Sequence, residues 1–274
     1  MLARTLNKLN HWWIKLRTDG PKQILIRCWF RYEKYWTINN YAFGKLVELM
    51  GNRVNIGGLR FSVDNKQITT REKSAFFFGK WEQAERHAID SYLRSDLPVV
   101  ELGGCLGIVS CHINKKLERP EQHVVIEANP GILPTLEKNR ELNNCKFVVR
   151  HAALGYGSSY VDLHLTNIGA NSLAPISDNI IEVPAVSLET ILEDTGFETV
   201  SLVMDVEGAE VDLLEREIDV LRKSVATLVF EIHRGEMCSK ARWDAIRANL
   251  IGAGFRILER IHVVWVFENT RLVH

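Results

Sequence analysis

A glycine-rich turn is the first part of this sequence whose residue types point to chemistry. It reads Glu101-Leu-Gly-Gly-Cys-Leu-Gly107 and follows an apolar run that is typical of a buried strand. Glycines allow the backbone to approach a ligand closely before a helix begins. The next strand-like run ends in Glu127, 24 residues after Gly103. Because an acidic side chain at that position can accept hydrogen bonds from ribose hydroxyls, the two features predict a nucleoside ligand.

Nicotinamide dehydrogenases and methyltransferases that use S-adenosylmethionine both fit this arrangement. A dinucleotide needs a G-x-G-x-x-G turn for its pyrophosphate, but Cys105 stands at the middle-glycine position here. Glu101 is a poor neighbour for a pyrophosphate and a good one for the cationic sulfonium and amino groups of S-adenosylmethionine. The residues therefore favour the methyltransferase, with an NAD(P)-dependent oxidoreductase as the alternative. For Glu127 the alternative role is to cap the following helix.

A second acidic motif, Asp205-Val-Glu-Gly-Ala-Glu210, follows a later strand-like run. Together with the glycine turn, this motif makes the chain resemble the FkbM family of methyltransferases from about Val54 to Phe267. Shorter stretches carry the same resemblance: Glu127-Ala-Asn-Pro130, Asn139 and Asn143, His151-Ala-Ala-Leu154, and Val186-Ser-Leu-Glu-Thr-Ile-Leu192.

The glycine turn also departs from the family pattern, which is usually Asp-x-Gly-Ala-Asn-x-Gly. Glu101, Gly104 and Cys105 replace the Asp, Ala and Asn of that pattern. Glu is an adequate substitute for the acid, but Cys cannot make the hydrogen bonds of an amide. We therefore expect a cofactor affinity or geometry that differs from the family's.

The resemblance implies S-adenosylmethionine as cofactor and a hydroxyl of a sugar, glycan, glycolipid or other natural product as acceptor. It places Glu101 at the charged end of the cofactor and Glu127 at the ribose. The other cofactor-binding residues that it implies are Gly103, Gly104 and Gly107 beneath the methionine part, and Asn129, His151 and Ala152 around the adenosine.

An alcohol acceptor must lose a proton, so a general base or a metal ion is expected. Asp205, Glu207 and His233 follow two strand-like runs and are the candidate catalytic residues, with His233 the natural base near neutral pH. The alternatives are a surface histidine at 233 and a favourable helix N-terminal charge at Glu207. Asp205 and Glu231 could instead hold a divalent ion, but two carboxylates are weak support, so no metal site is predicted.

The elements that must position these residues alternate from Pro98 onward, as in a mostly parallel sheet covered by helices on both faces. The expected strands are Val99–Leu102, Val124–Glu127, Phe147–Arg150, Leu202–Asp205, Thr227–Glu231, Arg256–Leu258 and His262–Phe267. The expected helices are Ile108–Leu117, Leu133–Leu142, Glu207–Leu221 and Ala241–Leu250, after a hairpin over Arg53–Asp64 and a helix over Ser74–Leu93. The prediction is an α/β fold with a Rossmann-like class I methyltransferase sheet over residues 51–274.

Residues 1–50 are predicted to be a separate, basic and Trp-rich helical extension. Residues 1–75 hold 14 Lys/Arg against 5 Asp/Glu and four of the seven tryptophans, whereas residues 76–274 hold 20 against 29. Amphipathic helices of this composition over residues 1–36 can lie in a membrane interface. The alternative is that they pack on the main domain or on a second copy of the chain, and packing on a second copy would make a homo-oligomer.

The composition of the whole chain narrows the classes of function. Lys+Arg and Asp+Glu are both 34, which argues against a nucleic-acid binder. No apolar run reaches the ~18–20 residues of a membrane span, and no secretory signal is recognisable. Five cysteines without a C-x-x-C pair indicate reduced thiols and a cytoplasmic protein, with peripheral membrane contact as an addition. A non-catalytic adaptor that retains the fold is the remaining alternative.

Overall fold

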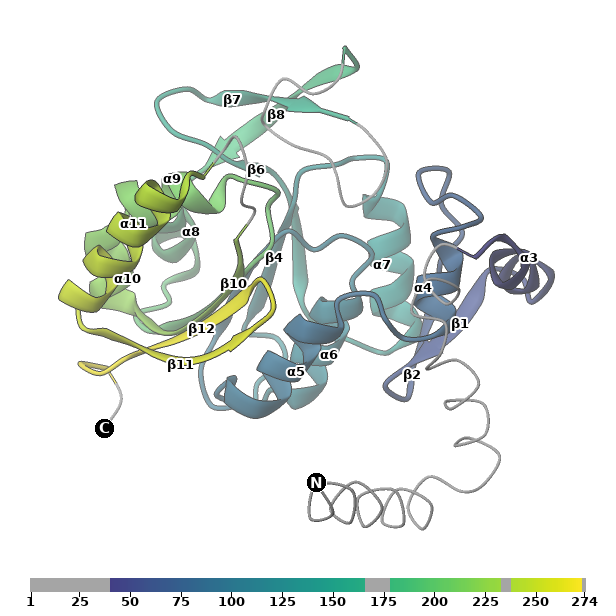
Figure 1. Cartoon of the computed structure of the whole chain (residues 1–274), viewed down its shortest axis with the longest axis horizontal. Helices are drawn as coiled ribbons and strands as arrows, with labels where there is room; N and C mark the ends of the chain where they lie inside the picture. The colour runs from purple at the N-terminus through teal and green to yellow at the C-terminus, as the bar shows by residue number, and fades with distance from the viewer. Residues whose placement is uncertain (1–39, 166–177, 233–237, 273–274) are drawn as a thin grey trace, which may run out of the picture.

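A seven-stranded mixed sheet forms the centre of the computed structural model, which describes residues 40–165, 178–232 and 238–272 (Figure 1). Its strand order is β11-β12-β10-β9-β3-β4-β5. The bounds are β3 Val99–Leu102, β4 His123–Glu127, β5 Val148–His151, β9 Val200–Met204, β10 Val225–Glu231, β11 Phe255–Ile261 and β12 Val264–Asn269. Only β12 runs antiparallel to both of its neighbours. This order confirms the predicted Rossmann-like class I methyltransferase sheet.

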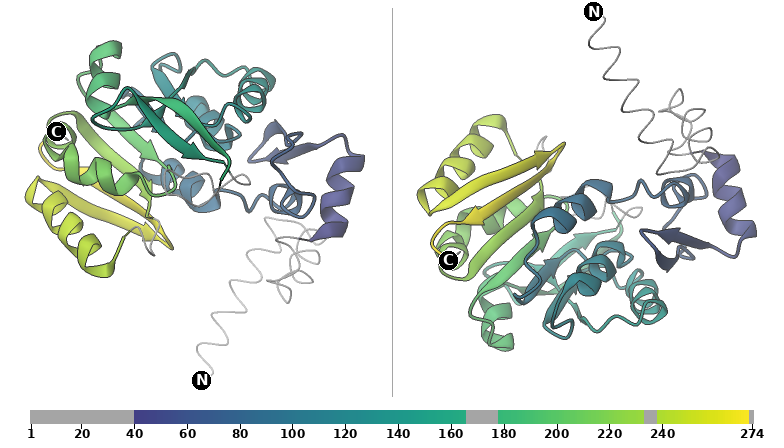
Figure 2. Two further views of the ribbon diagram at one scale, coloured as in Figure 1. Left: turned by 90° about the horizontal axis from the view of Figure 1, so that it is seen from above. Right: turned by 90° about the horizontal axis from the view of Figure 1, so that it is seen from below.

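Helices cover both faces of the sheet, as the views of Figures 1 and 2 show. One face carries α5 (Gln83–Tyr92), α6 (Ile108–Lys116) and α7 (Leu133–Leu142), and the other carries α8 (Leu188–Thr195), α9 (Glu210–Arg216), α10 (Ile218–Ser224) and α11 (Lys240–Gly252). Every residue of β3, β4 and β9 is therefore buried, which explains their apolar composition. The carboxyl ends of these parallel strands meet at one edge of the sheet.

Two of the predicted helices are wrong in part, and both differences affect this edge. The expected helix over Ser74–Leu93 is divided into α4 (Lys73–Phe77) and α5. The division follows from Gly79 and Glu82, which both adopt positive φ angles, of 62° and 48°. The helix expected from Glu207 begins at Glu210, because Glu207 and Gly208 form a turn with φ angles of 52° and 107°.

A small three-stranded sheet lies beside the same edge, with the order β6-β8-β7 (Figure 1). Its strands are β6 (Ala153–Leu154), β7 (Tyr160–His164) and β8 (Ile180–Val186). Its apolar side chains Ala153, Leu163 and Val183 form a core cluster of their own. This sheet therefore adds a wall next to the ends of the main strands.

The predicted hairpin is confirmed as β1 (Arg53–Ile56) paired with β2 (Leu59–Ser62), after helix α3 (Tyr41–Leu49). Two asparagines of the FkbM-like motif attach it to α7. Asn139 exchanges hydrogen bonds with the Ser62 backbone at 2.7 and 3.0 Å, and Asn143 does the same with Arg60 at 3.0 and 2.8 Å. These asparagines therefore position the hairpin.

The predicted helices over residues 1–36 lie outside the described residues, so their contact with a membrane or a protein stays a prediction. The division of the chain at residue 50 also stays a prediction, although α3 is described and its Val47 belongs to one core cluster with residues of the hairpin. Among the described residues, no helix combines the length and the apolar character that crossing a membrane requires.

Candidate active site

A cavity of about 890 Å³ opens at the carboxyl ends of the central strands. This volume lies within the usual range of small-molecule sites. Its wall is made by residues that end β3, β4, β9 and β10 and by residues around α5, among them Leu102, Ile126, Glu127, Asp205, Glu231 and Glu85. Ligands of sheets of this class bind at this edge, so the cavity is the candidate active site.

The glycines of the turn have two different functions. Gly103 lines the cavity with a φ angle of 92°, and a Cβ atom there would lie 1.9 Å from the Asp205 carbonyl oxygen. Gly104 and Gly107 face the interior instead, where a Cβ would lie 2.4 Å from Val125 and 2.6 Å from Leu136. The structure therefore places Gly103 against a ligand, as expected, and uses Gly104 and Gly107 for close packing between helix and strand.

Cys105 also lines the cavity, and its backbone explains why the family pattern has Asn at this position. Its φ angle is 47°, in the left-handed region that Asn tolerates better than other non-glycine residues. Burial, with Glu82 and Glu127 nearby, raises the pKa of the Cys105 thiol well above its usual value. The thiol is therefore uncharged and is no nucleophile at neutral pH.

Glu127 is buried on the cavity wall at the end of β4. Its two carboxylate oxygens accept hydrogen bonds from the backbone N–H groups of Cys105, at 2.8 Å, and Asn129, at 2.7 Å. Burial raises the pKa of Glu127 to about 7, against the lowering effect of these N–H donors. Helix α7 begins further along with Ile132 as N-cap, so Glu127 holds the turn rather than capping the helix. Its remaining lone pairs can accept further hydrogen bonds.

The three residues expected around the adenosine are not equivalent. Ala152 and Asn129 line the cavity. The buried Asn129 amide is engaged by protein, since it donates to Gln67 at 2.6 Å and accepts from Gly131 N–H at 2.9 Å. His151 is not part of the cavity wall, because its imidazole turns to the Ala128 carbonyl at 3.0 Å. The structure thus keeps Ala152 at the cavity and gives Asn129 and His151 contacts that fix the turn.

Glu101 does not face the cavity, which is a correction to the expected contact with the charged end of the cofactor. Strand alternation turns its side chain toward α6, where it accepts from Ser110 Oγ at 2.9 Å and lies 2.9 Å from His123 Nε2. Burial raises the pKa of Glu101 to about 8 and lowers that of His123 to about 3. We conclude that the two groups form a buried, hydrogen-bonded pair, and that Leu102 and Gly103 face the cavity instead.

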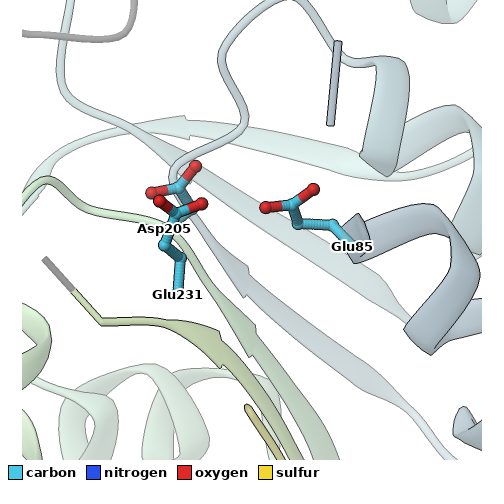
Figure 3. Close-up of side chains that lie close together, drawn as sticks. All are labelled: Glu85, Asp205 and Glu231. Atoms are coloured by element: carbon cyan, nitrogen blue, oxygen red, sulfur yellow. The ribbon is translucent and has the colours of Figure 1, made fainter. Parts of the chain in front are cut away.

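Three carboxylates meet at the other end of the cavity (Figure 3). Glu85 of α5, Asp205 after β9 and Glu231 at the end of β10 each offer an oxygen, and these atoms all lie within 4.8 Å of one another. Glu207, on the turn before α9, lines the same cavity but is not part of this group. The structure thus brings Asp205 and Glu231 together and places Glu207 on the cavity wall, whereas His233 lies outside the described residues.

Glu85 and its neighbour Glu82 were missed by the sequence reasoning. Glu85 follows Trp81 by four residues and precedes Ala88 by three, which places an acid at the border of the apolar face of a helix. An acid at the border of an apolar helix face is the feature of the sequence that could have indicated Glu85. Burial, strengthened by the charge of Glu85, raises the pKa of Glu82 to about 8. The acidic end of the cavity therefore includes a helix that no sequence motif marks.

The sheet order and a cavity at its carboxyl ends define a Rossmann-like methyltransferase. The family model described as methyltransferase FkbM domain matches residues 103–257, and the chain belongs to this family. The match supports methyltransferase activity and does not identify the acceptor. It begins after α5, so Glu85 lies before the matched residues.

Several solved structures are similar to the chain at low sequence identity. One is a protein of the NADB-Rossmann superfamily from Streptococcus agalactiae, with 14% identity, a TM-score of 0.42 and 68% of each chain covered. A putative O-methyltransferase from Klebsiella pneumoniae has 12% identity and a TM-score of 0.41, covering 69% of this chain and 80% of that one. Aeropyrum pernix fibrillarin with bound S-adenosyl-L-methionine has 11% identity and a TM-score of 0.37, covering 64% and 67%. No curated protein matches the sequence.

Proposed function

We propose that the protein moves the methyl group of S-adenosylmethionine to a hydroxyl of a sugar, a glycan or glycolipid, or another natural product. The observation that carries the cofactor assignment is Glu127, whose carboxylate lies on the cavity wall at the end of β4. Backbone donors already fix its orientation, so its remaining lone pairs are preorganised for the two ribose hydroxyls.

The residues of the cavity fit the cofactor in other respects. The apolar side chains of Leu102, Ile126 and Leu154 also line the cavity, and an adenine ring would find apolar contacts there. Gly103 would lie beneath the methionine part. Carboxylates at the β9 and β10 ends provide the negative potential that favours a sulfonium. Bound S-adenosylmethionine would supply an activated methyl group for transfer.

The proposed reaction breaks the bond between sulfur and the methyl carbon and forms a bond between that carbon and the acceptor oxygen. S-adenosylhomocysteine and a methyl ether are the products, and the hydroxyl proton passes to a base. Asp205 and Glu207 are the candidates on the cavity wall, and His233 stays a prediction. The chain's own part is to hold the acceptor in line and to accept this proton.

Binding measurements separate this function from the two alternatives. We expect calorimetry to show binding of S-adenosylhomocysteine and none of NAD. Glu127→Ala should weaken that binding by about 30-fold or more, because hydrogen bonds to a charged group contribute about 1.5–3 kcal/mol each. Glu121→Ala, an exposed acid before β4 at the opposite edge of the sheet, is the matched control.

Thermal stabilisation by NAD alone would exclude the proposed cofactor, and unchanged affinity in Glu127→Ala would exclude the proposed ribose contact. For the acceptor, we expect a labelled-methyl screen over glycans and lipids to yield label in an ether linkage. Label found only on nitrogen or carbon would contradict O-methylation. A protein that binds the cofactor but labels no acceptor in any such screen would support the adaptor instead.

A further inference from the structure

The acidic end of the cavity combines side chains from three separate elements. Helix α5 contributes Glu85, the end of β9 contributes Asp205 and the end of β10 contributes Glu231, and all three point toward one another (Figure 3). One oxygen from each lies within 4.8 Å of the other two. Negative charges at this separation repel, more strongly in a cavity than in bulk water.

Glu85 makes this arrangement more than a cluster of acids. It is only 8% exposed, and it forms no hydrogen bond or ion pair with any residue of the described chain. Lys80 donates to Gln83, and Arg86 donates to the carbonyls of Gly79 and Trp81, so that Arg86 acts on Glu85 through its charge but forms no ion pair with it. Buried carboxylates are normally paired or bound to a metal ion. A carboxylate that is buried, without a protein partner and aimed at two others indicates a bound cation.

We propose that Glu85, Asp205 and Glu231 form a binding site for one divalent cation of the Mg²⁺, Mn²⁺ or Ca²⁺ type. Carboxylate oxygens are the preferred ligands of these ions. Two ligands on opposite sides of a Ca²⁺ ion lie about 4.8 Å apart, because each bond is about 2.4 Å long. The observed limit of 4.8 Å therefore places all three oxygens within reach of one ion. Monovalent or organic cations are the competing occupants.

The site has a consequence for the acceptor, and this step rests on the proposed function. Three carboxylates occupy three of the six or more positions around such an ion, which leaves positions open toward the cavity. A vicinal diol, as in a sugar, can fill two of them with its oxygens. Coordination lowers the pKa of a bound hydroxyl, so the proton would leave more easily for Glu207 on the same wall. The inferred acceptor class is therefore a vicinal diol.

The test uses the purified full chain without cofactor, with Mn²⁺ as the probe and its electron paramagnetic resonance signal as the measure of free ion. We expect one saturable site, displaced by Mg²⁺ or Ca²⁺. Glu85→Gln and Glu231→Gln should each weaken Mn²⁺ binding by about tenfold or more. Glu121→Gln, the exposed acid at the opposite edge of the sheet, should leave it unchanged. Retained binding of S-adenosylhomocysteine would show that each variant is folded.

Absence of saturable Mn²⁺ binding, or equal binding in Glu85→Gln and the wild type, would overturn the proposal. So would a Glu85→Gln variant that keeps Mn²⁺ but loses preference for S-adenosylmethionine over S-adenosylhomocysteine, since the carboxylates would then serve the sulfonium. These outcomes can be distinguished from the outcomes that test the proposed function. A protein that binds Mn²⁺ but no S-adenosylhomocysteine would keep the cation site and refute the methyltransferase cofactor.

Discussion

At the β4 end of the cavity both carboxylate oxygens of Glu127 accept backbone N–H groups, whereas at the β9–β10 end Glu85 faces Asp205 and Glu231. Glu127 is fixed by the fold before any ligand arrives. Glu85 has no such support, although it is buried to a similar extent. The difference supports both proposals, hydroxyl donors at the first end and a cation at the second.

Gly103 follows β3, which lies between β4 and β9 in the sheet. Its replacement should have the largest effect on stability. In Gly103→Ala the new Cβ would meet the Asp205 carbonyl oxygen at 1.9 Å, so the end of β3 must move from β9. We expect a loss of at least about 3 kcal/mol in the free energy of unfolding, measured by urea titration. Gly58→Ala is the control, because Gly58 also has a positive φ but no atom within 4 Å of its Cβ position. It should lose only about 1 kcal/mol. Equal losses in Gly103→Ala and Gly58→Ala would contradict the close approach of Gly103 to the Asp205 carbonyl oxygen.

Removing the charge at each end tests the comparison directly. In buffer with EDTA, Glu127→Gln should lose about 1–3 kcal/mol in the free energy of unfolding, because one backbone N–H loses its acceptor. Glu85→Gln should be unchanged or more stable, since it removes repulsion from the acidic cluster. Urea titration of both variants and the wild type measures these changes in the free energy of unfolding. A loss in Glu85→Gln that matches that of Glu127→Gln would mean that both ends are satisfied by the protein alone.

The buried acid of β3 predicts a smaller effect that depends on pH. The pKa of Glu101 is raised from 4.5 to about 8, so the folded protein keeps a proton that the unfolded chain releases over this interval. Stability should therefore fall as pH rises from about 4.5 to about 8. Relative to the wild type, Glu101→Gln should gain about 1 kcal/mol for each pH unit in that window. His123 contributes in the opposite direction between about pH 3 and 6.5, so the difference is measured most cleanly above pH 6.5, where His123 is neutral in both the folded and the unfolded chain.

Urea titrations of wild type and Glu101→Gln at pH 5, 6, 7 and 8 would measure this difference. A constant difference between the two proteins would show that Glu101 is charged in the fold. The buried contact between Glu101 and His123 would then be an ion pair.

The sheet could be predicted from the sequence because burial on both faces demands apolar strands, which alternation with helices makes visible. The same reasoning placed Glu127 and Asp205 at the cavity, since Glu127 ends such a strand and Asp205 follows one. It failed for Glu101, because a side chain within a strand can turn to either face. It also failed for Glu85, whose position depends on the break before α5, and a positive φ at Glu82 leaves no compositional mark.

The break between α4 and α5 affects which stretches of the sequence form the walls of the active site. The proposed nucleoside end is formed by residues between the glycine turn and Leu154, whereas the acidic end also depends on helix α5, which precedes this stretch. A recombinant in which residues 73–97 come from another protein of this fold would keep the nucleoside end and replace one wall of the acceptor end. Under the proposed function, acceptor preference and cofactor affinity are therefore separable in the gene, although they share one cavity in the protein.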